Sequence, residues 1–219
     1  TYVMGRNTEH RAEKSIASLK GIKAVPRSIW VLIVVASFSS FAFRVSGSFM
    51  VVYATQELSL TNTQWGLITT LVSVVSTALT IPGSILSDRV GRKPGITLGL
   101  ILNPAQMIGF TFAGDFLGVM ACRILGGIAE GFGGNVYGLE GGSAWLALVA
   151  DVVPSSRRGS VMGLIATLAG LFSLPGTFVG GFMYDHVSIL MPFQTAFITS
   201  LAAAAMFILF VKEPVKKAE

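Results

Sequence analysis

Four charged residues lie inside long runs of apolar sequence: Arg44, Arg123, Glu130 and Glu140. An arginine at the centre of a membrane helix costs about 2.5–3.5 kcal/mol on insertion scales, so it is expected to face a cavity or a partner. A guanidinium binds a carboxylate or phosphate through two parallel hydrogen bonds, and a carboxylate inside a span can carry a proton. The alternatives are structural, because Glu130 follows Arg123 by two helical turns and can neutralise it, and Glu140 can lie in a hydrated irregular segment.

The apolar runs that contain these charges are long enough to cross a membrane. The chain has 219 residues, of which 52% are hydrophobic and 12% charged, whereas a soluble domain carries about 25% charged residues. About 20 apolar residues span the hydrocarbon core. We therefore predict an all-α, polytopic membrane protein whose six spans are residues 29–53, 65–86, 96–113, 116–152, 161–183 and 189–211.

The basic residues outside the spans all fall on one side of the predicted topology. These fourteen residues are Arg6, Arg11, Lys14, Lys20, Lys23, Arg27, Arg89, Arg92, Lys93, Arg157, Arg158, Lys212, Lys216 and Lys217. This asymmetry predicts cytoplasmic termini in a plasma membrane or a bacterial or archaeal cell membrane. The net charge of +5 therefore reflects orientation, and no nucleic-acid partner is expected.

Three regions follow from this topology: a basic cytoplasmic segment (1–28), the six-helix bundle (29–211) and a cytoplasmic tail or the start of a central linker (212–219). The first segment can form an amphipathic helix on the inner leaflet or remain disordered.

The stretch "GSILSDRVGRKPG" at 83–95 is predicted to be a tight cytoplasmic turn between the second and third spans. Gly91 permits the turn, and Pro94 suits the first turn of the next helix. An ordinary loop on the positive side explains the basic residues. It does not explain Asp88 or the close order of acid, bases and glycine.

That order resembles the loop 2–3 signature of the major facilitator superfamily, G-x-L-x-D-R-x-G-R-K. The matching residues are Leu86, Asp88, Arg89, Gly91, Arg92 and Lys93, and the leading glycine, Gly83, comes one position early. Weaker matches follow in the same order, through Arg123 and Gly127 in the fourth span and through Asp151, Pro154, Arg158 and Gly159 after it. The resemblance covers residues 29–214.

The resemblance implies a role for each group of residues. The family has twelve spans in two bundles, so this chain would be a half or a fragment that pairs with a second six-helix bundle, either another copy or a C-terminal half. Spans one and four line the central cavity, where Arg44 and Arg123 would bind an anionic substrate. Glu130 and Glu140 are the candidates for ion or proton coupling. The residues expected to form a conformational switch at the cytoplasmic loop are Gly83, Asp88, Arg89, Gly91, Arg92, Lys93, Asp151 and Arg158.

The fourth run is too long for one simple span. A straight helix over 116–152 would measure about 55 Å, against a hydrocarbon core of about 30 Å. Glycines concentrate between 126 and 142, which predicts a kink or an unwound stretch. Such a break often marks a binding site in transporters, although close packing through small residues with a bend is an equal alternative.

These observations favour a secondary active transporter that moves a small anionic solute by alternating access, with membrane lipid, a second bundle and the solute as partners. The alternative is a non-transporting scaffold or assembly subunit built on the same bundle. No glycine-rich phosphate loop, zinc-spaced His/Cys set or nucleophile elbow occurs, so neither enzymatic activity nor a cofactor or metal site is expected.

Overall fold

The computed structural model describes residues 27–133, 135–137, 141–153 and 155–211, and this part of the chain is helical apart from short connections. The elements are α2 (Arg27–Val52), the π-helix η2 (Tyr53–Glu57), α3 (Asn62–Val90), α4 (Arg92–Phe112), α5 (Phe116–Gly131), α6 (Ser143–Val152), the 3-10 turn η4 (Ser155–Arg157), α7 (Arg158–His186) and α8 (Met191–Phe210). The fold class predicted from composition is confirmed. The predicted tail, Glu140 and nearly all of the basic N-terminal segment lie outside the described residues.

Five helical segments in the described part of the chain are long and apolar enough to cross a membrane. They are Arg27–Glu57, Asn62–Val90, Arg92–Phe112, Ser155–His186 and Met191–Phe210. Each matches one of the predicted runs. The helices around 65–86, 96–113 and 161–183 extend several residues beyond the apolar stretch at their charged ends, because a helix does not end where the hydrocarbon does.

The fourth predicted run is divided into two helices. Helix α5 has 16 residues and α6 has 10, and the described residues between Gly131 and Ser143 are not helical. At 1.5 Å per residue α5 is about 24 Å long, shorter than the hydrocarbon core of about 30 Å. The predicted break is thus confirmed, whereas the count of six continuous spans is not fully met.

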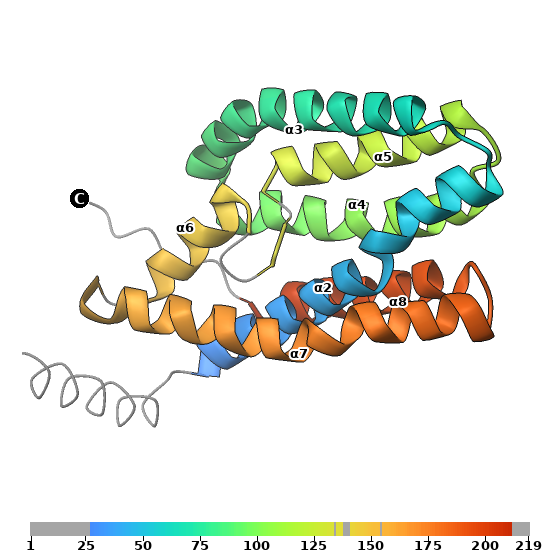
Figure 1. Ribbon diagram of the computed structural model, residues 1–219. Coiled ribbons are helices and arrows are strands. Elements are labelled where there is room, and N and C mark those ends of the chain that lie inside the picture. The colour runs from blue at the N-terminus through green and yellow to red at the C-terminus, as the bar shows by residue number, and fades with distance from the viewer. Residues whose placement is uncertain (1–26, 134, 138–140, 154, 212–219) are drawn as a thin grey trace, which may run out of the picture.

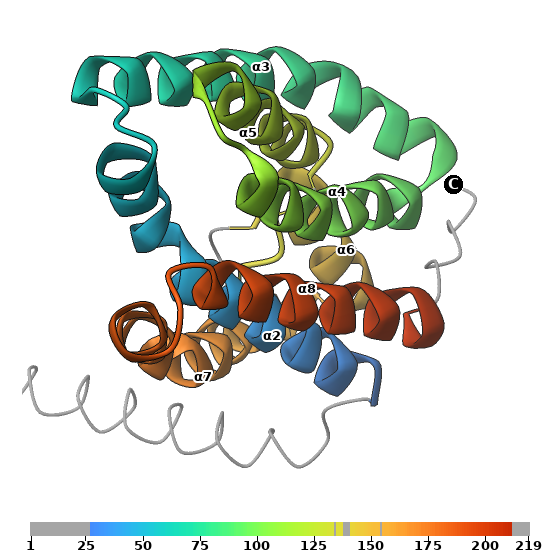
Figure 2. The same ribbon diagram turned by 90° about the vertical axis from the view of Figure 1, so that its right-hand side faces the viewer.

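The helices form two groups of three, α2 with α7 and α8, and α3 with α4 and α5. Figures 1 and 2 show the groups as two layers, which meet where α4 packs against α8. In Figure 1 the α3–α4 turn and the start of α7 lie at the same end of the bundle as the start of α2. This end carries Arg27, Arg89 and Arg157 and is called the basic end below.

Large apolar side chains hold the short helix α6 in place. Trp145 and Leu148 are fully buried in a cluster that includes Ile96 of α4 and Phe207 of α8. A fully buried apolar side chain contributes about 1.5–3 kcal/mol relative to an exposed one. Tertiary packing therefore fixes α6, which is too short to be stable by itself.

Candidate functional site

The turn at the basic end consists of one residue between two helices. Helix α3 ends at Val90 and α4 begins at Arg92, so Gly91 alone makes the connection. Its φ of 117° lies in a region that L-residues with side chains rarely adopt. The predicted tight turn is confirmed, and it brings Asp88 and Arg92 together across the turn.

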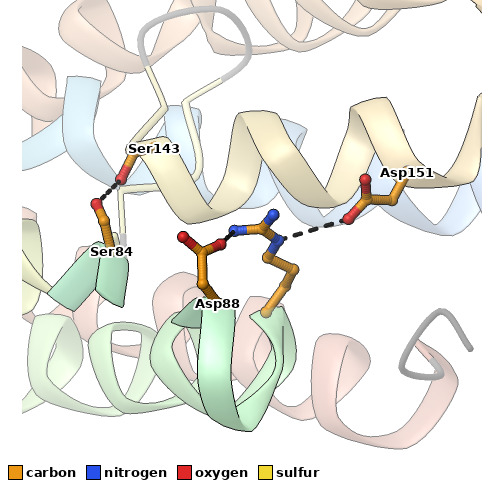
Figure 3. A network of polar contacts seen from close by, with 5 residues as sticks. Ser84, Asp88, Ser143 and Asp151 are labelled. Atoms are coloured by element: carbon orange, nitrogen blue, oxygen red, sulfur yellow. Dashed lines mark hydrogen bonds and ion pairs between the residues drawn. The ribbon is translucent and has the colours of Figure 1, made fainter. Parts of the chain in front are cut away.

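The guanidinium of Arg92 binds two carboxylates from two other helices. Its Nη1 lies 2.5 Å from Asp88 Oδ1 of α3, and its Nε lies 3.5 Å from Asp151 Oδ2 in the last turn of α6. Figure 3 shows Asp88 and Asp151 on opposite sides of this group. The Asp88 and Asp151 side chains are 64% and 46% exposed, so each ion pair contributes about 0–1 kcal/mol. Contacts this weak can break and form again without unfolding the bundle.

Two more bases at this end bind helix carbonyls. Lys93 Nζ donates to the Ile208 carbonyl of α8 at 2.9 Å, and Arg158 Nη2 donates to the Ala150 carbonyl of α6 at 2.9 Å. Both carbonyls belong to the last turn of their helix, where no intrahelical donor exists and positive charge is favourable. Arg89 is exposed and makes no ion pair with the described residues.

The leading glycine of the loop signature allows two helices to touch. A Cβ on Gly83 would lie 2.6 Å from the carbonyl oxygen of Gly131 at the end of α5, so only glycine fits there. The next residue, Ser84, shares a hydrogen bond of 3.1 Å with Ser143 at the start of α6. Gly83 therefore places α3 against the break in the fourth span, although it stands one position early in the signature.

Inside the bundle, Arg123 of α5 bridges to two other helices. Its Nη1 donates to Gln106 Oε1 of α4 at 3.3 Å and lies 3.6 Å from Met50 Sδ of α2. Its Nε is buried without a hydrogen-bond partner among the described residues. The described residues thus bind Nη1 of this guanidinium and leave its Nε without an acceptor.

Gln106 is the residue that sequence reasoning missed. It is 3% exposed, and its carboxamide lies against Gly126, where no larger residue would fit. Two sequence features could have indicated this contact: an amide inside an apolar span, and a glycine one turn after Arg123. Asn103, one turn before Gln106 on α4, is a second amide of the same kind.

The predicted partner of Arg123 acts on it from a distance. No ion pair within 4 Å joins Glu130 and Arg123, both of which lie in the described part of α5, but the two charges are close enough to interact electrostatically, and Tyr137 lies within range of both. Tyr137, in the break, packs its ring against Phe43 with centroids 4.8 Å apart. The break therefore lies beside the charges of α5.

Arg44 has different surroundings. Its backbone lies in the α2–α7 contact, where Thr177 donates a hydrogen bond to the Arg44 carbonyl at 3.5 Å. Its side chain is exposed and has no hydrogen bond or ion pair with any described residue. Arg123 contacts α2 at Met50, six residues and about 9 Å farther from the basic end.

The loop signature and the bundle together match one family over most of the chain. The sequence profile described as Major Facilitator Superfamily matches residues 32–219. The chain belongs to the Major Facilitator Superfamily. As a member of this superfamily it is an integral membrane protein, and its helices that can span a membrane agree with this.

Two relatives in the superfamily show the extent of sequence similarity. The quinolone resistance protein NorA of Staphylococcus aureus is 29% identical over 161 residues, which cover 74% of this chain and 39% of NorA. An MFS-type transporter of Methanocaldococcus jannaschii is 31% identical over 155 residues, covering 71% of this chain and 38% of that protein. The chain thus spans about two fifths of the length of these superfamily relatives.

Solved structures of the superfamily show the same fold. The human organic anion transporter TETRAN has a TM-score of 0.63 and 19% identity, with 87% of this chain and 49% of that chain covered. A D-xylose–proton symporter has a TM-score of 0.65 and 15% identity, with 86% and 49% covered. The named solutes differ widely, so the shared superfamily fold does not select a substrate, and the substrate must be argued from the site.

Proposed function

We propose that this superfamily bundle is one half of a secondary active transporter that moves a small anionic solute by alternating access. The proposal rests on the surroundings of Arg44, which lies near the middle of a membrane helix. Its charged side chain is exposed and has no partner among the described residues. Such a charge is costly in lipid, so it must face water, a ligand or another protein surface. A cavity between two bundles supplies all three.

The proposed anion specificity rests on two guanidiniums. Among the described residues, the Arg44 side chain has no partner, and the Nε donor of Arg123 has no hydrogen-bond acceptor. Gln106 fixes the other side of Arg123, so little side-chain freedom would be lost when an anion binds. A carboxylate or phosphate monoester matches the planar donors of arginine.

The second bundle is proposed from the geometry of Arg44 and from the length of the relatives. A lone bundle would turn Arg44 toward lipid. The second bundle is either another copy of this chain or another polypeptide segment, and a parallel pair about a two-fold axis is possible because both termini are expected on one side. Glu130 and Glu140 are the proposed coupling residues, and the cluster around Arg92, formed with Asp88 and Asp151, is the proposed switch.

Ligand binding to the purified protein tests the proposal. The full chain, together with any second bundle that co-purifies, would be placed in lipid nanodiscs, and its stoichiometry measured by mass photometry. We expect small carboxylates or phosphate monoesters to raise its melting temperature, because a ligand that binds only the native state stabilises it. Neutral analogues of the same size should have no effect.

Two matched variants identify the site. Arg44→Gln should abolish the anion-dependent shift while leaving the melting temperature without ligand unchanged. Arg157→Gln, which removes an exposed base of the η4 turn, should retain the full shift. Failure of all anions to stabilise the protein or to enter proteoliposomes would support the scaffold function instead.

A further inference from the structure

A small cavity lies in the centre of the bundle, where α2, α4, α8 and the break in the fourth span meet. Its volume is about 10 Å³, and its polar lining comes from Ser39, Asn103, Tyr137 and Ser200, with Phe43, Leu100 and Met107 as its apolar walls. Ser39, Asn103 and Ser200 each lie halfway along their helix. The cavity is therefore near mid-depth in the membrane.

The hydroxyl of Ser39 points to an occupant of this cavity. Ser39 is 6% exposed, and its Oγ has no hydrogen-bond partner among the described residues. Its neighbours on α2 behave differently, since Ser37 donates to the Ile33 carbonyl at 2.8 Å and Ser46 to the Ala42 carbonyl at 3.1 Å. A buried hydroxyl left unsatisfied destabilises a protein by about 1–3 kcal/mol. Ser39 lines the cavity instead of bonding to its own helix.

The size and chemistry of the cavity restrict what can fill it. A volume of roughly 10–15 Å³ is the least that holds one water molecule, which needs two to four polar partners. The serine hydroxyls, the amide of Asn103 and the phenol of Tyr137 can provide them. None of these groups is charged, so a bare cation at this depth would be poorly compensated.

We propose that this cavity holds one ordered water molecule that hydrogen-bonds Ser39 and connects Tyr137 to α2, α4 and α8. Non-helical backbone at membrane depth is tolerated only where protein or water covers it. The water thus completes the polar surroundings of the break and fixes the position of Tyr137, which packs on Phe43. This proposal is independent of the transported solute.

Hydroxyl-radical footprinting with synchrotron X-rays tests it on the whole protein in nanodiscs. Radicals formed from a trapped water oxidise the side chains beside it even when these are buried. Met107 is 4% exposed and Phe110 is fully buried. We expect mass spectrometry to show oxidation of Met107 several-fold above that of Phe110.

Substitutions that fill the cavity provide the decisive comparison. Ser39→Val, or Ser200→Val on α8, should lower oxidation of Met107 several-fold. Ser37→Val, which lies outside the cavity on the same helix, should not change it. Each variant would be accepted only if it elutes as the wild type does in size exclusion, and two cavity variants are included in case one does not fold.

Three results would overturn the proposal. Met107 could remain as unreactive as Phe110, or its oxidation could persist in a folded cavity-filling variant. Replacement of K⁺ by Na⁺ in the buffer could also abolish the oxidation, which would show that a sodium ion occupies the cavity.

Discussion

Gln106 and Gly126 face each other so closely that the carboxamide oxygen lies where a side chain on Gly126 would begin. The same oxygen accepts the hydrogen bond from Arg123. The glycine thus makes room for the amide, and the amide orients the arginine. Three residues of α4 and α5 act as one unit, although only the arginine is conspicuous in the sequence.

Gly126→Ala is predicted to disrupt this unit. The added methyl would displace Gln106 from a position that is 3% exposed, and overpacking of this kind destabilises a protein by about 1–3 kcal/mol. We expect a lower melting temperature in nanodiscs and a loss of any anion-dependent shift that requires Arg123.

Two variants separate the clash from the general effect of alanine in a helix. Gly170→Ala adds a methyl to α7 where no atom lies within 4 Å, so it should be neutral or slightly stabilising. Adding Gln106→Ala to Gly126→Ala should restore much of the lost stability because it removes the clashing group. Equal melting temperatures for Gly126→Ala and Gly170→Ala would contradict the prediction.

Lys93 is predicted to hold the end of α8 against the start of α4. Lys93→Gln loses the charged hydrogen bond to the Ile208 carbonyl, so the last turn of α8 should open more often. Hydrogen exchange of the amides at 208–210 should accelerate. Arg89→Gln, which removes a neighbouring exposed base, is the control and should leave these amides unchanged, whereas identical exchange in both variants would assign Lys93 no role at α8.

The sequence predicted the long spans well because hydrocarbon length and apolar composition determine them directly. The run at 96–113, for example, corresponds to α4 at Arg92–Phe112. It could not predict how the fourth span divides. Gly126 and Gly127 were included in the expected break, yet both remain helical in α5, because these glycines fit against Gln106 and Val72 of neighbouring helices.

The candidate site was only partly predictable because packing between helices, which the sequence does not specify, brings some of its residues together. The loop residues are close in sequence, so the contact of Asp88 with Arg92 follows from local geometry. The contacts of Gln106 with Arg123 and Gly126 depend on how α4 packs against α5, which the sequence alone does not specify. Arg44 and Arg123 are recognisable as intramembrane charges, but their exposure depends on how α2 packs against α7 and how α5 packs against α4.

Asp88→Asn is predicted to slow transport without unfolding the protein. The carboxylate is one of two that bind Arg92, and its side chain is 64% exposed, so stability should change by less than about 1 kcal/mol. Solute uptake by proteoliposomes should fall several-fold while the melting temperature stays close to that of the wild type. Asp185→Asn, an exposed carboxylate at the opposite end of the bundle, should transport normally. Uptake by Asp88→Asn equal to that of Asp185→Asn would reduce the loop charges to a determinant of orientation.

The basic end of the bundle is predicted to face the cytoplasm. Every described Lys or Arg outside the spans lies at this end, and none occurs in the connections 58–61, 113–115 or 187–190. Such an asymmetry determines insertion because basic residues are retained on the cytoplasmic side.

In a Cys122→Ala background, a membrane-impermeant maleimide added to intact cells should label Gln56→Cys and Ser188→Cys, which are exposed at the opposite end. Ser155→Cys, exposed at the basic end, should react only after the membrane is opened. Labelling of Ser155→Cys in intact cells, with Gln56→Cys protected, would reverse the orientation and place the cluster around Arg92 outside the cell.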